Sequence, residues 1–357
     1  MKKKDKPNRI VFFPKGNYNI PSTRYRCVFY ARELKKHGFF TSIMPPRSIL
    51  KKNICIERYR EARKTIGELS QSRKNTIIYA QRTVYQSDFI RFLWVYKKLF
   101  NINVVFDFDD SIFLRRKQRT DRMLKISDVV IVGSHFLAEY AQKYNDNVYI
   151  VPTAIDTDKF KPARPEKRAK FKIGWVGDGK TYQDDLIMLK KPLISLARTH
   201  NIMFKIIGTK DCHKLKEAYK KCEHLKVEMI DWMEPDEIAS ELTTFDIGVY
   251  PLLDNEWNKG KCGLKALEYM SAGIAAVCSD VGENKYFIED EKDGLLARTS
   301  DEWETKLRVL IENNQLKEQI AINGRKTVEE KYSIRVAGEK LAEILKNKFW
   351  NNNSMEE

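Results

Sequence analysis

Short apolar segments alternate with helical sequence patterns along most of the chain, and this alternation restricts the fold more than any other feature. Such a pattern is typical of parallel sheets that carry helices on both faces. The sequence predicts strands at Arg9–Phe13, Phe39–Ile43, Thr76–Ala80, Val104–Phe106, Val129–Val132, Val148–Val151, Lys172–Val176, Phe204–Gly208, Val227–Ile230, Ile247–Tyr250 and Ala275–Cys278. We therefore expect an α/β protein with two doubly wound sheets.

The chain length and one proline-rich segment predict two domains. A chain of 357 residues exceeds the size at which a single hydrophobic core stops growing. The segment PTAIDTDKFKPARPEKRAK, which starts at Pro152, has three prolines and many charges but no apolar periodicity, as expected for a linker. We expect domains at residues 1–164 and 165–334. Helical sequence runs from about Asp301 to Phe349, and residues 335–357 are expected to form a C-terminal helix that packs back towards the first domain.

The chain is strongly basic, with 65 Lys and Arg against 49 Asp and Glu and a net charge of +16. Such a charge suits nucleic acid, an anionic membrane surface or phosphate-bearing ligands as partners. The basic residues are spread along the sequence, and it contains no helix-turn-helix, zinc-finger or aromatic RNA-binding motif. We therefore expect no nucleic-acid partner, although a basic nucleic-acid-binding protein stays an alternative.

Cysteine and histidine usage argues against metal sites and disulfides. The six cysteines form no C-x-x-C pair, and none of the five histidines is spaced like a metal-binding pair. The first apolar run, Ile10–Phe13, is far too short for a signal-peptide core, and no later stretch approaches 18 apolar residues. The sequence predicts a cytoplasmic protein without a metal or other cofactor.

The segment GWVGDGKT matches the phosphate-binding pattern G-x-x-x-x-G-K-[ST] through Gly174, Gly179, Lys180 and Thr181. A P-loop NTPase is therefore an alternative function. However, Gly174 continues the apolar strand pattern, and Pro192 is expected to kink or split the next helix. We interpret the segment as a nucleotide-phosphate loop of another type.

The segment KGKCGLKALEYMSAG, residues 259–273, combines a glycine-rich turn with a helix. Backbone N–H groups and the helix dipole would face an anion placed at such a turn. Lys261, Lys265 and Glu268 are spaced i, i+4, i+7, which predicts one stripe on a helix face. Two ammonium groups beside a carboxylate suit a diphosphate attached to a ribose. The alternative is a surface ion pair worth about a few tenths of a kcal/mol.

Three acids, Asp107, Asp109 and Asp110, end a predicted strand in the segment FDFDDS. Three neighbouring carboxylates could bind magnesium or calcium. We favour the other interpretation, in which they shape a cleft or pair with Arg115 and Arg116.

Five segments together resemble the retaining GT-B glycosyltransferases of glycosyltransferase family four, particularly those that make bacterial surface polysaccharides. The resemblance covers nearly the whole chain. The segments are STRYR (Ser22–Arg26), VPTAIDTDKF (Val151–Phe160), IGWVGDG (Ile173–Gly179), FDIGVYPL (Phe245–Leu252) and KCGLKALEYMSAGIAAVCSDVG (Lys261–Gly282).

The resemblance implies a GT-B fold, with two Rossmann-like domains that face a central cleft. It implies that the first domain binds the acceptor and that the second domain binds a nucleotide sugar. By the same resemblance, Glu268 binds the donor ribose, and the backbone amides of Gly263 and Leu264 bind the diphosphate. We expect Lys261 and Lys265 as catalytic residues. The other expected donor-binding residues are Gly177, Lys180, Asp231, Trp232 and Met233, and the expected acceptor-side residues are Gly16, Arg24, Arg82 and Asp109.

The sequence departs from the family pattern at several site positions. Gly260 stands where the family has a first glutamate, eight residues before the second. Asp178 and Gln183 stand where the family has two basic residues that bind the diphosphate. We expect Lys261 and Lys265, together with Lys180, to take over that role. Where a histidine often follows a strand of the first domain, this chain has Gln81 and Arg82. A catalytically inactive relative is therefore an alternative.

The expected function is metal-independent, retaining transfer of a hexose from a UDP- or GDP-linked donor to a glycan or lipid-linked acceptor, in cell-surface polysaccharide synthesis. The surplus of positive charge also suggests peripheral contact with the anionic inner face of the plasma membrane.

Overall fold

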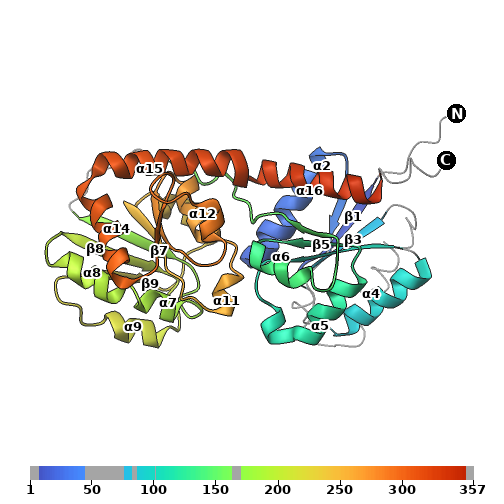
Figure 1. The fold of residues 1–357 in the computed structure, drawn as a ribbon, viewed down its shortest axis with the longest axis horizontal. Coiled ribbons are helices and arrows are strands. Elements are labelled where there is room, and N and C mark those ends of the chain that lie inside the picture. Colours follow the sequence, from blue (N-terminus) through green and yellow to red (C-terminus); the bar gives the residue numbers. More distant parts are fainter. Residues whose placement is uncertain (1–7, 45–75, 83–86, 101, 163–169, 351–357) are drawn as a thin grey trace. The chain divides into compact units, whose positions relative to one another are not determined.

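The computed structural model describes residues 8–44, 76–82, 87–100, 102–162 and 170–350. The chain divides into two compact units, one made of Met1–Thr153 with Ile334–Glu357 and the other of Ala154–Ser333. Each unit contains a six-stranded parallel sheet, shown in Figure 1. The predicted α/β class with two doubly wound sheets is confirmed. In the part of the chain that the structure describes, no helix is long and apolar enough to cross a membrane.

The sheet of the first unit has the strand order β2-β1-β3-β4-β5-β6. The strand order reverses between β1 and β3, and in doubly wound sheets such a point is where ligands bind, at the carboxyl ends of the strands. The strands are β1 (Arg9–Phe13), β2 (Phe40–Ile43), β3 (Thr76–Gln81), β4 (Asn103–Phe108), β5 (Val129–Val132) and β6 (Val148–Ile150).

Helices cover both faces of this sheet. Right-handed crossovers place α4, α5 and α6 on one face, while α2 and α16 pack together on the other (Figure 1). A Cβ on Gly338 of α16 would lie 2.6 Å from the Cβ of Glu33, so glycine permits this close approach. The helical segments are α1 (Pro21–Thr23), the π-helical η1 (Arg24–Val28), α2 (Phe29–Lys36), α4 (Ser87–Phe100), α5 (Phe113–Ile126), α6 (His135–Ala141) and α16 (Ile334–Phe349).

The sheet of the second unit has the order β12-β11-β10-β7-β8-β9, and its strand order reverses between β7 and β10. The short strand β12 was missing from the sequence prediction. The strands are β7 (Phe171–Val176), β8 (Ile202–Ile207), β9 (Lys226–Ile230), β10 (Ile247–Tyr250), β11 (Ala275–Ser279) and β12 (Leu295–Ala297).

Helices α8 and α9 cover one face of the second sheet, and α12 and α15 cover the other (Figure 1). The helical sequence predicted from about Asp301 to Phe349 divides into separate helices, because Asn313 caps α15 and Ser333 is extended. The helices are α7 (Gln183–Ile187), α8 (Lys190–Ala197), α9 (His213–Tyr219), α10 (Pro235–Leu242), α11 (Glu256–Lys259), α12 (Leu264–Ser271), α13 (Asn284–Phe287), α14 (Ser300–Glu312), α15 (Asn314–Thr327) and the π-helical η4 (Val328–Tyr332).

Two glycines in the central strands let aromatic rings lie directly on the second sheet. A Cβ on Gly174 would overlap the ring of Phe245, and a Cβ on Gly248 would overlap the ring of Tyr269. The hydroxyl of Tyr269 also accepts a hydrogen bond from the backbone N–H of Val176 at 3.2 Å. The rings thereby hold β7 and β10 against α12, whose N-terminus carries the candidate site.

The division between the units follows Thr153, whereas the sequence prediction placed it at residue 164. Ile155 forms a β-bridge with Ser333. The carbonyl of Phe160 accepts hydrogen bonds from Ser271 Oγ at 2.9 Å and from Arg325 at 2.5 Å. These contacts hold the segment of residues 154–162 on the second unit, although it has no apolar periodicity that would reveal this in the sequence.

Candidate active site

The loop after β7 forms the floor of the candidate site in the second unit. The backbone N–H of Gly177 donates to Ile207 at 3.0 Å, and that of Gly179 donates to Gly208 at 2.8 Å. A Cβ on Gly208 would collide with the carbonyl oxygen of Gly177. Glycines therefore let the loops after β7 and β8 touch backbone to backbone at the carboxyl edge of the sheet, where doubly wound sheets bind ligands.

The N-terminus of α12 lies at the same edge, and Gly263 is its N-cap with a left-handed φ of +71°. A Cβ here would overlap the ring of Phe287, so both conformation and space require glycine. The first N–H groups of a helix have no partner within the helix and favour an anion. The predicted glycine-rich turn leading into a helix is confirmed, and Leu264 is the first residue of that helix.

Lys265 and Glu268 form a largely buried ion pair on α12, with 3.1 Å between Nζ and Oε2. Their side chains are 13% and 4% exposed, respectively. A Cβ on Gly177 would lie 3.4 Å from Cε of Lys265, so the pair stands directly beside the loop after β7. Many ion pairs on helices have this i, i+3 spacing, but most of them are exposed to solvent. The Lys265–Glu268 pair differs because it is buried beside a glycine loop.

Lys261 lies outside the stripe that its spacing predicted. Because α12 begins at Leu264, Lys261 belongs to the preceding loop and cannot share a helix face with Lys265. Its side chain is buried, and Nζ lies 5.2 Å from the ring centroid of Tyr182 and 4.8 Å from that of Trp257. The ring of Tyr182, at the N-cap of α7, and the ring of Trp257, in α11, hold the ammonium group by cation–π attraction.

A buried carboxylate, that of Asp185, joins α7 to the segment that precedes Lys261. Oδ1 of Asp185, in α7, accepts hydrogen bonds from the backbone N–H of Leu253 at 2.7 Å and from Nδ2 of Asn258 at 2.8 Å. Burial raises the pKa of Asp185, while the hydrogen bonds and nearby Lys261 act in the opposite direction. Sequence reasoning missed Asp185, Asn258, Tyr182 and Trp257, because nothing in their local pattern shows that α7 and the loop after β10 meet.

The Walker interpretation of GWVGDGKT does not fit the structure. Gly174 lies in the middle of β7 and pairs with Lys205 on one side and Gly248 on the other, so it cannot open a phosphate loop. Lys180 and Thr181 are exposed in the connection to α7. The predicted break near Pro192 is confirmed, because α7 and α8 are separate and Pro192 lies in the first turn of α8.

The loop after β9 carries Asp231, Trp232 and Met233. Oδ1 of Asp231 accepts from Nζ of Lys216 at 2.6 Å and from Oγ1 of Thr209 at 3.1 Å, and its pKa is lowered chiefly by Lys216. Trp232 is 56% exposed, with Nε1 donating to Glu234 at 3.3 Å. An exposed indole at the carboxyl edge of the sheet offers an apolar surface to a planar ring.

A second cluster of polar side chains lies in the first unit, at the ends of β3 and β4. Arg82 has a left-handed φ of 50°, and its Nη1 contacts Oδ1 of Asp109 at 3.3 Å and Oδ2 of Asp110 at 2.7 Å. Burial raises the pKa of Asp109, and Arg82 opposes that shift. The backbone N–H of Lys15 donates to Oε1 of Gln81 at 2.8 Å, which joins the loop after β1 to the end of β3.

Nε2 of Gln81 is a buried donor without a hydrogen-bond partner in the structure. Left-handed backbone at a non-glycine residue, as at Arg82, concentrates at functional sites. An unsatisfied buried amide beside such a residue is suited to a ligand oxygen. The two acceptor-side residues Arg82 and Asp109 thus come together.

Gly16 and Arg24 lie in the neighbouring loop after β1. Gly16 donates to and accepts from Oγ1 of Thr23, at 3.4 and 3.2 Å. Nη1 of Arg24 donates to the carbonyl of Tyr18 at 3.1 Å, and its guanidinium lies 5.5 Å from the ring centroids of Tyr18 and Tyr25. Both residues shape this loop.

Asp107 has a different role from the two acids that follow it. It is fully buried, and Oδ2 accepts from Arg26 at 2.7 Å and from the hydroxyl of Tyr79 at 2.5 Å. The acids of FDFDDS therefore pair with Arg26 and Arg82, where the sequence interpretation named Arg115 and Arg116. Among the residues that the structure describes, no three His, Cys, Asp or Glu side chains form a group that could hold a metal ion.

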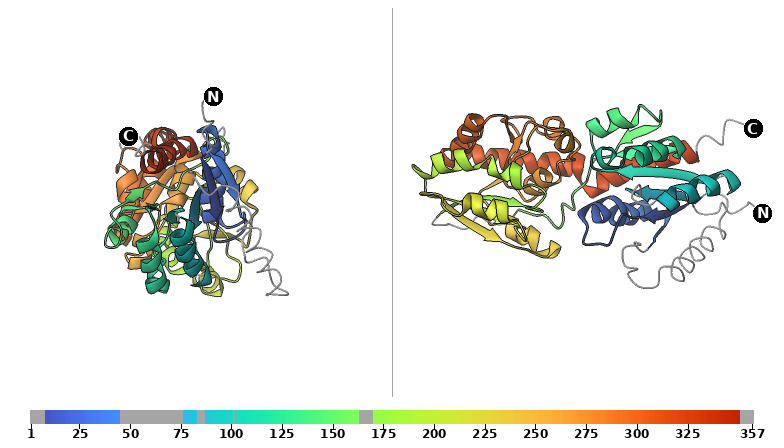
Figure 2. Two further views of the ribbon diagram at one scale, coloured as in Figure 1. Left: turned by 90° about the vertical axis from the view of Figure 1, so that its right-hand side faces the viewer. Right: turned by 90° about the horizontal axis from the view of Figure 1, so that it is seen from below.

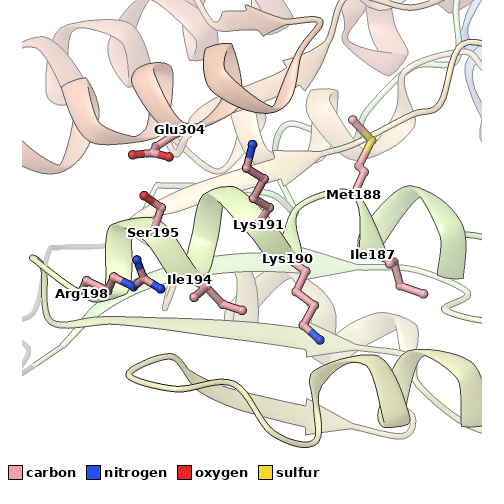
Figure 3. A pocket seen from close by; sticks show the side chains of 8 residues that line it. All are labelled: Ile187, Met188, Lys190, Lys191, Ile194, Ser195, Arg198 and Glu304. Atoms are coloured by element: carbon pink, nitrogen blue, oxygen red, sulfur yellow. The ribbon is translucent and has the colours of Figure 1, made fainter.

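A pocket of about 570 Å³ lies elsewhere in the second unit, along α8 and facing α14 (Figure 3). Its lining includes Ile194 and Ser195 from α8, Arg198 at the C-cap of that helix, and Glu304 from α14. None of the predicted donor-site residues lines this pocket. It is therefore separate from the candidate site.

Comparison with known proteins gives the class of fold. Residues 170–313 match the family model described as glycosyl transferases group 1. Sucrose-phosphate synthase from Thermosynechococcus elongatus has a TM-score of 0.72 at 14% identity, over 96% of this chain and 99% of that one. HepE from Anabaena, solved with UDP-glucose, has a TM-score of 0.70 at 13% identity, over 95% and 99%.

A glycosyltransferase from Rickettsia africae has a TM-score of 0.69 at 14% identity, over 97% of this chain and 100% of that one. No sequence among curated proteins matches the chain. The protein therefore has the fold of the GT-B glycosyltransferases, and residues 170–313, within its second unit, match the group 1 glycosyl transferase family.

Proposed function

We propose that the protein is a retaining glycosyltransferase that moves a sugar from a nucleoside-diphosphate sugar to a glycan or lipid-linked acceptor. One arrangement carries the proposal: the N-terminus of α12, with left-handed Gly263, opens beside the Gly177 loop and the Lys265–Glu268 pair. A helix N-terminus and an ammonium group suit a diphosphate, and a carboxylate accepts hydrogen bonds from ribose hydroxyls.

In this proposal the donor lies across the carboxyl edge of the second sheet. The backbone amides of Gly263 and Leu264 bind the diphosphate, Glu268 binds the ribose and Trp232 lies against the base. Exposed Lys180 contacts the phosphates from the other side of the Gly177 loop. The UDP-glucose complex of HepE, which shares the fold, supports a UDP-linked donor, and a GDP-linked donor is the second choice.

The proposed reaction begins as the sugar–phosphate bond ionises and the diphosphate leaves with the bonding electrons. The acceptor hydroxyl attacks the anomeric carbon from the same face, and its proton passes to the leaving diphosphate. Lys261 and Lys265 stabilise the charge that grows on the leaving oxygens. Such preorganised donors are usually a large part of catalysis, and this chemistry requires no metal ion.

The first unit is proposed to bind the acceptor. The Gln81 amide and the Arg82–Asp109 pair provide hydrogen-bonding groups at the edge of the sheet where the strand order reverses. The resemblance of the sequence motifs to surface-polysaccharide enzymes supports a cytoplasmic role in cell-surface polysaccharide synthesis.

Thermal unfolding with a panel of nucleotides tests the donor proposal. UDP, GDP, ADP, CMP, their sugars and ATP are each added with magnesium and with a chelator. A ligand at 100 times its Kd stabilises the folded state by about 2.7 kcal/mol. We expect one nucleoside diphosphate and its sugar to raise Tm equally in both conditions. Stabilisation by ATP with magnesium alone, or by no nucleotide, would contradict the proposal.

A further inference from the structure

The helix α4 has two apolar faces, of which one is buried and the other is exposed in the part of the chain that the structure describes. Ile90, Leu93 and Tyr96 are buried against the first unit. On the outer face, Trp94, Val95 and Leu99 are 48%, 44% and 70% exposed. Exposed large apolar side chains that gather on one helix face mark a contact site, whereas single ones need no explanation.

Basic side chains flank this apolar strip. Arg91 and Lys98 are exposed, and with Trp94, Val95 and Leu99 they occupy positions i, i+3, i+4, i+7 and i+8 of α4. Nζ of Lys98 lies 4.5 Å from the ring centroid of Trp94. The outer face of α4 thus combines an indole and aliphatic side chains with long cationic ones, the composition of helices that lie in a membrane interface.

The neighbouring helix extends the same surface. Figures 1 and 2 show α4 and α5 side by side on one face of the sheet, and the two helices are in contact. Leu114 of α5 is also exposed, at 48%. The acid Asp121 accepts from Lys117 and from Tyr140. The exposed basic residues of α5 are Arg115, Arg116, Lys117, Arg122 and Lys125.

We propose that the outer surface of α4 and α5 binds an anionic lipid membrane, with Trp94 and Leu99 in the interface and the basic side chains at the headgroups. Charge complementarity selects this occupant, because basic residues outnumber acidic ones on the exposed surface of both helices. The core of a protein–protein interface is instead depleted of lysine and other charged residues. Tryptophan and lysine together are characteristic of the membrane–water boundary.

The inference does not depend on the proposed donor chemistry, because no residue of this surface belongs to the candidate site. If the acceptor is lipid-linked, the same unit that is proposed to bind the acceptor would also contact the membrane.

Flotation with lipid vesicles tests the proposal. The full chain is mixed with phosphatidylcholine vesicles, or with vesicles containing phosphatidylglycerol, in low salt and in 1 M salt, a concentration at which screening reaches about 3 Å. We expect binding to the anionic vesicles that weakens in high salt. Equal binding to both vesicle types, or binding to neither, overturns the proposal.

Paired substitutions separate the apolar from the electrostatic contribution. Arg91→Glu with Lys98→Glu should weaken partitioning at least about thirtyfold, since each basic group near an anionic leaflet contributes roughly 1 kcal/mol and 1.4 kcal/mol is a factor of ten. Trp94→Ser with Leu99→Ser should weaken it on the order of tenfold even in high salt. All four positions are exposed, so Tm should stay near that of the unmodified protein.

Matched controls lie in the second unit. Ile322 of α15 is 64% exposed, and the side chains of Lys220 and Lys326 are 64% and 72% exposed. Lys220→Glu with Lys326→Glu makes the same change in net charge as the basic pair of α4, and Ile322→Ser removes one exposed aliphatic side chain. Both controls should leave partitioning within about threefold of the original. Equal losses in the controls would show that net charge alone governs binding, which overturns the assignment to α4 and α5.

Two further measurements distinguish a membrane from a protein partner. Bromine-substituted acyl chains should quench tryptophan fluorescence in the unmodified protein, and Trp94→Phe should remove most of that quenching. Sedimentation velocity of the free protein should show the same oligomeric state with and without the α4 substitutions. An oligomer that dissociates in those variants would make this surface a protein interface and overturn the proposal. Donor-induced thermal stabilisation should be unchanged throughout.

Discussion

Lys261 and Lys265 lie on either side of the N-cap Gly263 and have different backbone settings. Lys261 is held in a loop between aromatic rings, whereas Lys265 is held on the helix by Glu268. Each can place an ammonium group near a diphosphate without a change of fold. Substitution of either lysine should therefore lower kcat, whereas substitution of a residue that binds only the ground state should raise the Kd of the nucleotide.

At this scale we predict that Lys261→Ala and Lys265→Ala each lower kcat on the order of a hundredfold, because a preorganised charged donor acts mainly on the transition state. Glu268→Ala should instead raise the Kd of the nucleoside diphosphate about tenfold or more, and Lys180→Ala should have a smaller effect than either lysine variant. Steady-state kinetics and calorimetric titration measure both quantities.

Circular dichroism serves as the control, since all four variants should remain folded. Near-normal kcat in both Lys261→Ala and Lys265→Ala would contradict the assignment. If instead all variants and the original protein bind the donor without turnover, the chain is an inactive relative.

At the scale of elements, the junction between α12 and the loop that follows α11 depends on one backbone conformation. Gly263 has a φ of +71°, and a Cβ there would overlap Phe287. Gly38 has a φ of +87°, and a Cβ there would meet nothing within 4 Å. The two glycines therefore form a matched pair, in which only Gly263 combines backbone strain with a steric clash.

We predict that Gly38→Ala lowers the free energy of unfolding by about 1–2 kcal/mol, the usual cost of a left-handed L-residue. Gly263→Ala should cost more and should also weaken nucleotide binding, because the clash displaces the N-terminus of α12. Adding Phe287→Leu should recover part of the loss in the Gly263 variant only. Urea unfolding provides the measurement, and equal losses at both glycines would show that the contact with Phe287 is unimportant.

At the scale of the whole molecule, the division into two units separates the proposed donor site from the most buried ion pair of the first unit. Arg26 and Asp107 are fully buried. Burial lowers the pKa of Arg26, but Asp107 more than offsets this, so the pKa is raised well above its ordinary value. Removing one partner of such a pair leaves an uncompensated charge.

Arg26→Met should therefore destabilise the protein by about 3–5 kcal/mol. The Kd of the nucleoside diphosphate should not change, because its proposed ligands all lie between Ala154 and Ser333. The control Arg32→Met, at a side chain that is 53% exposed, should cost less than about 0.5 kcal/mol. A tenfold loss of nucleotide affinity in the folded Arg26→Met protein would contradict an independent donor site.

The amino-acid sequence by itself determined all the described strands except β12, together with the glycine turn before α12. Buried parallel strands are recognisable because every residue of a short run is apolar, and left-handed turns are recognisable by glycine. The predictions of β7 and β10, and of the turn before α12, depend only on such local patterns. For the same reason the helical pattern of KCGLKALEYM wrongly included Lys261, since the helix boundary depends on the conformation of Gly263.

Only the tertiary structure decided which distant residues meet. Arg26 and Asp107 are 81 residues apart, and Asp185 and Asn258 are 73 apart, so no periodicity relates them. Their contacts follow from the strand order, which places β4 near η1 and brings α7 beside the loop after β10. The exposed face of α4 has the same origin: its sequence is apolar on both sides, and only packing on the sheet determines which apolar face is buried and which remains for a partner.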